Sequence, residues 1–198
     1  MNERRASEKL QVKQSIIDVA KNIAAQDGWQ QVTIRKICDQ IRYTAPVIYQ
    51  YFENKEAILQ AIRREGIQEM YQSFEQINHK IKEPEDRLLA YGKAWWDFAL
   101  KNPELYQVMY NLQGANCQND HSNVGISTDV FYQEAFYQLN AKAKPANALS
   151  LELCDNLIAI IHGFIAFHMV DKIRSGSQRA ELVFIHSLKR FIHSIKTP

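Results

Sequence analysis

Two short amphipathic helical patterns lie back to back in residues 33–52, TIRKICDQIRYTAPVIYQYF, and no other segment restricts the fold as strongly. The first pattern has apolar side chains at the i, i+3, i+4, i+7 spacing of a helix with one buried face: Ile34, Ile37, Cys38 and Ile41. Thr33 precedes this pattern and offers a side-chain oxygen to the first amide N–H groups. The segment therefore begins with a short helix packed by one face.

The second pattern predicts a helix of about ten residues that opens at Thr44 and carries Pro46 in its first turn, where a missing N–H costs little. Ile48 and Phe52 point inward four residues apart. The opposite face has no carboxylate, since it consists of Ala45, Pro46, Val47, Tyr49, Gln50 and Tyr51. A short helix with such a face suits the major groove of DNA, which admits one helix.

The block T-I-R-K-I…T-A-P-V-I-Y-Q-Y-F-E-N-K-E-A-I resembles the helix-turn-helix of the TetR family of bacterial transcriptional regulators. The family pattern places T-x-R-x-I before a recognition helix that ends in Y-x-x-F, and a K-E-x-[IL] helix start follows at once. The chain departs from that pattern in the turn, where Arg42-Tyr43 stands in place of the frequent glycine. A non-glycine residue can take a positive φ there at some energetic cost.

This resemblance implies a role for each matching residue of the head. Arg35 would reach a guanine edge or a phosphate, and Gln50 could pair with adenine. Lys55 would bind phosphate at the start of the next helix. Thr33 and Thr44 fit either phosphate contacts or capping alone. The expected DNA-binding set is Thr33, Arg35, Thr44, Ala45, Pro46, Val47, Tyr49, Gln50, Tyr51 and Lys55.

The composition fits an all-α chain, because 198 residues include only 7 Gly and 5 Pro and no β-rich runs. Three widely spaced cysteines favour a reducing cytoplasm over a disulfide framework. Residues 1–65 carry 11 Lys and Arg against 8 Asp and Glu, whereas the remainder carries 13 against 14. We expect no signal peptide at the charged N-terminus and no membrane span, because the longest apolar stretch, 157–170, is short and contains two histidines.

The remaining patterns predict a three-helix head over residues 1–53 and a larger helical effector-binding and dimerisation domain over 54–198. The first helix should cover 8–26, after an arm (Arg4, Arg5, Lys9) that we expect to be mobile, although it could touch phosphate or the minor groove. A polar surface loop is expected at 113–127. Helices are expected at 54–81, 85–101, 104–112, 128–142, 147–174 and 178–195.

The last two predicted helices are apolar on most sides and must be covered on most sides. One chain of this size offers too few other helices to cover both. A two-fold homodimer in which the helices 147–174 and 178–195 meet their copies as a four-helix bundle solves this problem. Such a dimer would deliver two recognition helices to half-sites about 34–36 Å apart or somewhat more.

The sequence FALKNPELYQVMY, followed later by His162-Gly163, resembles the effector domain of a TetR subgroup with a W…HG signature. The resemblance implies a pocket for a small, mostly apolar effector, since the helices carry many aromatic side chains and show no buried Arg or Lys pair. Plain core packing is the alternative for each residue. The expected ligand-binding set is Trp95, Trp96, Tyr106, Met109, Tyr110, Phe131, His162 and Phe164.

Other functions are less well supported by the sequence. No glycine-rich phosphate loop, G-x-S-x-G or Cys-x-x-Cys motif is present, so we expect neither an enzyme nor a cofactor. Cys117 and His121 are four residues apart but lack a second ligand pair, so we expect no metal. The resemblance implies a repressor that a small effector releases from operator DNA, because repressors are more common than activators in that family. The alternative is a helical protein-interaction module without specific DNA binding.

Overall fold

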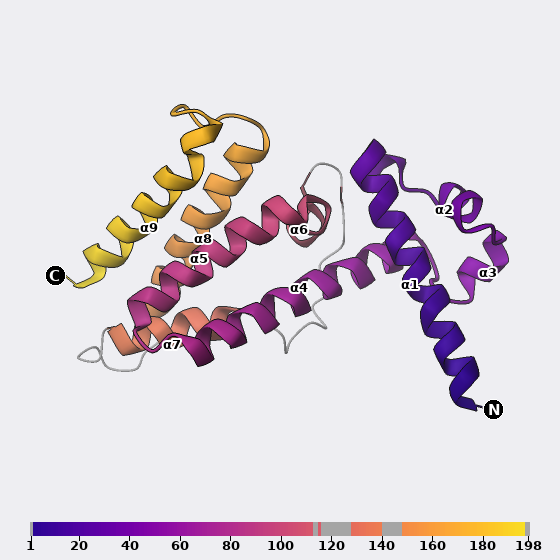
Figure 1. Ribbon diagram of the computed structural model, residues 1–198, viewed down its shortest axis with the longest axis horizontal. Coiled ribbons are helices and arrows are strands. Elements are labelled where there is room, and N and C mark those ends of the chain that lie inside the picture. The colour runs from indigo at the N-terminus through magenta and orange to yellow at the C-terminus, as the bar shows by residue number, and fades with distance from the viewer. Residues whose placement is uncertain (1, 113–114, 116–127, 140–147, 197–198) are drawn as a thin grey trace. The chain divides into compact units, whose positions relative to one another are not determined.

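The computed structural model describes residues 2–112, 115, 128–139 and 148–196, and all regular elements among them are helical (Figure 1). The all-α prediction is therefore confirmed. The chain forms two compact units, Met1–Gln68 with Asn102–Val124 and Glu69–Lys101 with Gly125–Pro198. Helix α4 belongs in part to each unit. The predicted boundary after residue 53 is a functional division, and it stays a prediction.

The first unit is built around α1 (Asn2–Asp27). Gly28, with φ 86°, follows this helix, and a short 3-10 turn (Trp29–Gln31) comes next, with the Trp29 side chain buried. Helices α2 (Ile34–Ile41), α3 (Ala45–Tyr49) and the first half of α4 (Lys55–Lys80) follow it, and α6 (Pro103–Met109) packs on α1. The core consists of apolar side chains with no more than 1% exposure: Ile16, Ala20, Ile23, Val32, Ile37, Ile48, Ile58 and Ile62.

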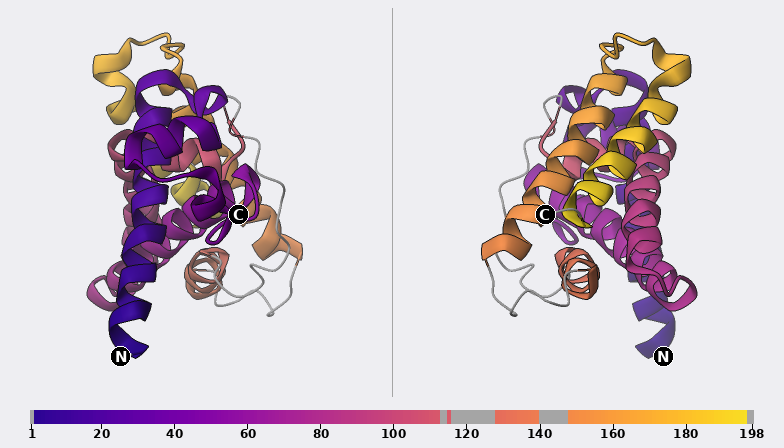
Figure 2. Two further views of the ribbon diagram at one scale, coloured as in Figure 1. Left: turned by 90° about the vertical axis from the view of Figure 1, so that its right-hand side faces the viewer. Right: turned by 90° about the vertical axis from the view of Figure 1, so that its left-hand side faces the viewer.

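The second unit contains the end of α4, α5 (Pro84–Lys101), α7 (Asp129–Leu139), α8 (Ala148–Met169) and α9 (Ala180–Lys196), with a 3-10 turn at Ser177–Arg179. Helix α5 contacts α7, α8 and α9, so it is the centre of this unit. Figure 2 shows α8 and α9 side by side. Aromatic side chains make much of the core; Phe74 of α4 and Tyr91 of α5, for example, stack with ring centroids 4.4 Å apart.

Within the described residues, four helices differ from their predicted bounds by three residues or more, and one of them, α6, ends at Met109 rather than residue 112. Helix α1 begins at Asn2, so the expected mobile arm is instead the first turns of this helix. Helix α3 has five residues rather than about ten. Helix α8 ends at Met169 rather than residue 174, because Asp171 takes φ 52° and the Lys172 N–H donates back to the Phe167 carbonyl at 2.8 Å. The loop at 113–127 lies outside the described residues except for Ala115, which is buried.

The apolar stretch of α8 is longer than the one predicted from the sequence, which was 157–170. Residues Leu151–Met169 have a mean hydropathy of 1.3 and are long and apolar enough to cross a membrane by length and composition alone, and 22% of this stretch is buried in the structure. Leu157, Ile161 and Ile165 are nevertheless fully buried, and α8 packs on α5, α7 and α9. We therefore interpret α8 as a packing helix with one covered and one uncovered apolar face.

Gly92 permits the close approach of α5 and α9. A Cβ at this position would overlap Leu188 Cδ1, and Leu188 is fully buried. We expect Gly92→Ala to destabilise the protein by about 1–3 kcal/mol, because an added methyl group must displace a packed side chain. Equilibrium urea unfolding measures this change.

The control for Gly92→Ala is a double-mutant cycle with Leu188→Ala, which makes room for the new methyl group. The double variant should lose less stability than the sum of the two single losses. Additive losses would show that the two positions do not compete for the same space.

Candidate nucleic-acid interface and ligand-binding region

Helix α2 is fixed at both its start and its inner face. The Thr33 hydroxyl accepts from the Lys36 N–H at 3.2 Å, as expected of an N-cap, and Ile37 and Cys38 are buried. Lys36 Nζ also lies 3.2 Å from Asp27 Oδ2, which ties α2 to the end of α1. Arg35 lies on the exposed side of this anchored helix.

The turn between α2 and α3 uses Arg42 in the left-handed region, with φ 57° and ψ 37°. The Tyr43 N–H donates to the Cys38 carbonyl at 3.3 Å, and this bond satisfies one of the last carbonyls of α2. The turn therefore forms without the glycine that is frequent in the TetR pattern. The Arg42 side chain is exposed.

Helix α3 is held by two side chains at its inner face, since Ile48 is fully buried and Phe52 is 5% exposed. The outer residues of the predicted set fall into two groups by exposure. Thr44, Pro46, Tyr49 and Gln50 are exposed, whereas Ala45, Val47 and Tyr51 are half-buried. The acid-free outer face predicted from the sequence is therefore open.

Thr44 occupies the N-cap position of α3, but its side chain makes no capping hydrogen bond. The two threonines of the predicted set thus differ, because Thr33 caps its helix and the Thr44 hydroxyl is not used in that way. The Thr33 hydroxyl therefore has a capping role, and the Thr44 hydroxyl does not.

The start of α4 contains a contact that sequence reasoning missed. Asn54 Oδ1 accepts from the Ala57 N–H at 2.9 Å, as expected of a cap. Lys55 Nζ donates to the Trp29 carbonyl at 2.9 Å, and burial lowers the pKa of this ammonium group. Lys55 is half-buried, and one of the three donors of its ammonium group is therefore committed inside the head.

Helix α4 is also joined to α1 by polar contacts. Glu65 accepts from Lys21 Nζ and from Gln14 Nε2, each at 3.1 Å. The Lys21–Glu65 pair is half-buried, so solvent screens it less than a fully exposed pair. A shift of α4 relative to α1 would have to break these contacts.

The predicted ligand-binding residues divide between the two units. Tyr106, Met109 and Tyr110 belong to the first unit, in which Tyr106 and Met109 are buried and Tyr110 is exposed. Trp95, Trp96, Phe131, His162 and Phe164 belong to the second unit. The second unit separates its members further into two aromatic clusters, because neighbouring residues of a helix point about 100° apart.

The Trp95 cluster, defined as Phe74, Tyr91, Trp95, Phe131, Tyr132 and His162, contains the polar groups. Trp95 Nε1 donates to the Tyr132 hydroxyl at 2.6 Å, and the Trp95 ring meets the His162 ring edge-on at 5.2 Å. Burial lowers the pKa of His162 from its ordinary value of 6.5 to about 4. His162 is therefore neutral at pH 7, with one ring nitrogen as a hydrogen-bond donor and the other as an acceptor.

The second cluster lies between α5, α8 and α9. The Trp96 ring stacks on Phe184 at 5.0 Å and lies 5.0 Å from the ring of His168, while Phe164 packs on Phe184 at 5.7 Å. Trp96 is 2% exposed and Phe184 is fully buried. This cluster joins the three helices and has the character of core packing.

A buried cation that the sequence patterns did not reveal, Arg87, lies near the Trp95 cluster. Arg87 is only 4% exposed, and its guanidinium donates to Asn78 Oδ1 of α4 and Gln138 Oε1 of α7. Glu134 Oε1 lies 3.7 Å from Arg87 Nη1. The expectation concerned a buried Arg or Lys pair, and this single guanidinium was not foreseen because its acceptor Gln138 is 51 residues away in the sequence. Arg87 therefore links α4, α5 and α7.

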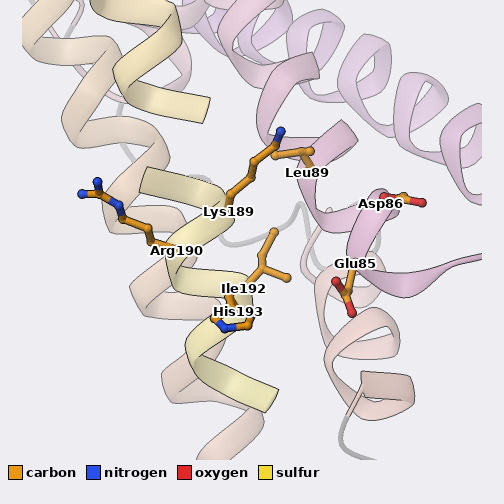
Figure 3. A pocket seen from close by; sticks show the side chains of 7 residues that line it. All are labelled: Glu85, Asp86, Leu89, Lys189, Arg190, Ile192 and His193. Carbon is orange, nitrogen blue, oxygen red and sulfur yellow. The ribbon is translucent and has the colours of Figure 1, made fainter. Parts of the chain in front are cut away.

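A groove of about 470 Å³ lies elsewhere in the second unit, between the start of α5 and the end of α9 (Figure 3). Its lining is strongly charged and contains Glu85, Asp86, Leu89, Lys189, Arg190, Ile192 and His193. None of these belongs to the predicted ligand-binding set, and the aromatic clusters remain the region of that prediction.

Metal ligands do not cluster among the residues that the structure describes, since no group of three or more His, Cys, Asp or Glu side chains could hold an ion there. Cys117 and His121 lie outside the described residues. Cys38 and Cys154 are buried free thiols.

Comparison with known protein families gives two matches along the chain. Residues 16–62 match the family described as bacterial regulatory proteins, tetR family, and residues 88–191 match the tetracyclin repressor-like C-terminal domain. No curated protein matches the sequence.

Solved structures agree with these family matches. A protein described as regulatory shares 17% identity with a TM-score of 0.78, covering 95% of this chain and 98% of that one. The TetR family transcriptional regulator PfmR from Thermus thermophilus shares 14% identity with a TM-score of 0.66, over 90% and 97% of the two chains. A TetR from Acinetobacter baumannii AYE, solved with minocycline, shares 15% identity with a TM-score of 0.66, over 91% and 94%. These similarities show the fold.

The largely covered imidazole of His162 leads to a pH prediction. Its pKa is about 4 in the folded protein and about 6.5 in the unfolded chain, so the unfolded chain binds more protons between these values. The free energy of unfolding should therefore fall as pH drops from about 6.5 towards about 4, and rise again with pH.

NMR titration of the histidine side chains measures this pKa directly in the folded protein. One imidazole, assigned by its loss in His162→Gln, should titrate near 4. A midpoint near 6.5 for that signal would show that His162 is exposed to solvent in the folded state.

Proposed function

The chain belongs to the TetR family of transcriptional regulators, and we propose that it is a homodimeric repressor that a small apolar effector releases from its operator. Members of this family are DNA-binding regulators and not enzymes. The observation that carries the proposal is the open, acid-free face of α3 above two buried anchors, Ile48 and Phe52. A function in transcription also implies a cytoplasmic location.

We assign the DNA contacts to the head, residues 1–53 with the start of α4. The open side chains Pro46, Tyr49 and Gln50 would meet the major groove, and Ala45 and Val47 would pack on thymine methyl groups. Tyr51 would lie at the edge of that contact. Arg35 of α2 would bind a guanine edge or a phosphate, and the Thr33 and Thr44 hydroxyls a phosphate. Lys55 would bind a phosphate with the ammonium N–H donors that do not bond to the Trp29 carbonyl.

Dimerisation is proposed through α8 and α9. Large apolar side chains remain uncovered on and next to these helices, with exposed fractions of 53% for Leu151, 60% for Phe167, 51% for Val170 and 49% for Leu182. Burying such a surface against a second copy is favourable, at about 25 cal/mol per Å² of apolar area. A four-helix bundle of α8, α9 and their copies would cover it and would pair the two heads.

The proposed effector region is the Trp95 cluster, with the other residues of the predicted set as its surroundings. A neutral His162 and the Tyr132 hydroxyl supply polar contacts within an aromatic wall, which suits a small aromatic or aliphatic molecule. Arg87 already serves Asn78 and Gln138, so its charge is engaged. The bound minocycline of the Acinetobacter TetR supports a small-molecule effector in general and does not identify this one.

Helix α4 is the element through which an effector would act. Its first half is fixed to α1 through Glu65, and its second half contributes Phe74 and Asn78 to the effector domain. An effector that binds one α4 orientation more tightly would shift the population towards that state. Two heads displaced in this way would no longer match their half-sites.

The DNA assignment predicts that Arg35→Ala and Tyr49→Phe weaken operator binding and leave dimerisation unchanged. We expect a loss of about 1–3 kcal/mol for Arg35→Ala and less for Tyr49→Phe, which loses only a hydroxyl. Fluorescence anisotropy with duplexes selected from a random pool measures both. Gln40→Ala and Tyr43→Phe are matched controls on exposed head positions outside the assigned set. Wild-type affinity in both test variants would refute the assignment.

The dimer assignment predicts that Phe167→Glu combined with Leu182→Glu gives a folded monomer. Light scattering should give twice 23.0 kDa for the wild type and 23.0 kDa for the variant. Tyr137→Glu is the matched control, because Tyr137 of α7 is 54% exposed and outside the proposed interface. A variant that remains dimeric with native helicity would place the interface elsewhere.

The alternative function is a helical protein-interaction module without specific DNA binding. It predicts no salt-dependent binding of duplex DNA, so the anisotropy experiment distinguishes it from the repressor. No observation in the described residues favours it over the repressor.

A further inference from the structure

Helix α1 extends well beyond the part of the head that carries its core. The family match begins at residue 16, whereas the helix begins at Asn2, so roughly four turns precede the matched region. The first core side chain of α1 with no exposure is Ile16, and residues 4–11 are exposed. Figure 1 shows this end of α1 projecting past α2 and α3 within the first unit.

Three cations follow one face of this extension at four-residue intervals. They are Arg5, Lys9 and Lys13, called here the N-terminal basic row, and all three are exposed. Residues four apart lie on the same side of a helix and rise by about 6 Å. That step is close to the axial rise of two nucleotides of one DNA strand, about 6.8 Å.

The inner end of the row lies next to the candidate recognition helix. Lys13 Nζ is 5.5 Å from the centroid of the Phe52 ring, and Phe52 follows α3 by three residues. The row therefore begins beside the end of α3 and continues away from the head along α1. A surface that holds α3 against DNA would be continuous with the row.

The cations of the row are available for a partner. Glu8, an acidic residue next to Lys9 on the extension, lies 3.0 Å from Arg4 Nε and is paired with it. Among the side chains that the structure describes, no carboxylate forms an ion pair with Arg5, Lys9 or Lys13. Asp18 and Glu65, further along, are engaged by Lys21.

We propose that the N-terminal basic row binds the phosphates of duplex DNA that flank the segment contacted by α3. This inference rests on the proposed function and extends the protein–DNA contact beyond the helix-turn-helix. Phosphate contacts carry no base information, so the row would raise affinity for all sequences and fix the orientation of the head.

The test combines Arg5→Gln, Lys9→Gln and Lys13→Gln in the 198-residue chain. The measurement is the affinity for duplex DNA of random sequence at several salt concentrations. Each lost phosphate contact should lower the slope of log K against log salt by about 0.9, or about 2.7 per protomer. At about 0.15 M salt, this corresponds to a loss of roughly 100-fold or more in affinity. Removing three exposed cations of the second unit, Lys82, Lys101 and Lys172, is the matched control and should change little.

A second variant separates the row from net charge. It combines the three row substitutions with Ser7→Lys, Gln11→Lys and Ser15→Lys, which moves the row to nearly the opposite face of α1 at unchanged net charge. The proposal requires that this variant remain as weak as the row variant. The proposal would be overturned if the variant with the moved row bound duplex DNA with wild-type affinity, or if the row variant kept the wild-type salt slope. Circular dichroism checks that α1 remains helical in both.

Two further outcomes identify the partner and separate this inference from the proposed function. Anionic phospholipid vesicles offer the same phosphate chemistry, and a loss of binding confined to vesicles would overturn the DNA assignment. A wild-type chain that binds no duplex DNA would refute the proposed function itself. If the wild-type chain binds duplex DNA and the row variant binds it with the same affinity and salt slope, only the proposed role of the row is refuted.

Discussion

The arrangement of the candidate DNA-binding surface depends on the burial of Ile48 and Phe52. Helix α3 has only five residues, and helices this short are not stable in water by themselves. Its direction must therefore come from its packing on α2 and from two buried side chains, Ile48 in the helix and Phe52 three residues after it. Because this inner face is fully used, the opposite face, with Pro46, Tyr49 and Gln50, has to be outward.

The same core decides how the head could communicate with the rest of the chain. The contact between Lys55 and the Trp29 carbonyl and the contacts of Glu65 fix the first half of α4 to the head. The second half enters another set of contacts, in which Asn78 accepts from Arg87. One continuous helix, α4, thus has contact partners in both units. This geometry is the physical basis of the proposed switch.

The sequence predicted the elements whose signals are local and missed those that depend on distant partners. The buried face of α2, the cap at Thr33 and the all-helical fold follow from spacing and residue type, and the structure confirms them. Spacing could not give the length of α3, which ends at Tyr49, three residues before the buried Phe52. Nor could it reveal Arg87, whose acceptor Gln138 is 51 residues away. The sequence showed that these helices are rich in aromatic residues, but it did not show that Trp95 and Trp96 belong to different clusters. That division depends on the packing of α7, α8 and α9 on α5.

The most direct test of the account is hydrogen–deuterium exchange of the head with and without a selected duplex. Residues 44–52 include a five-residue helix with an open outer face, so their amides should exchange quickly in the free protein. If α3 enters the major groove, these amides should become strongly protected in the complex. Protection that forms elsewhere on the chain, with unchanged exchange at 44–52 in a saturated complex, would contradict the central claim.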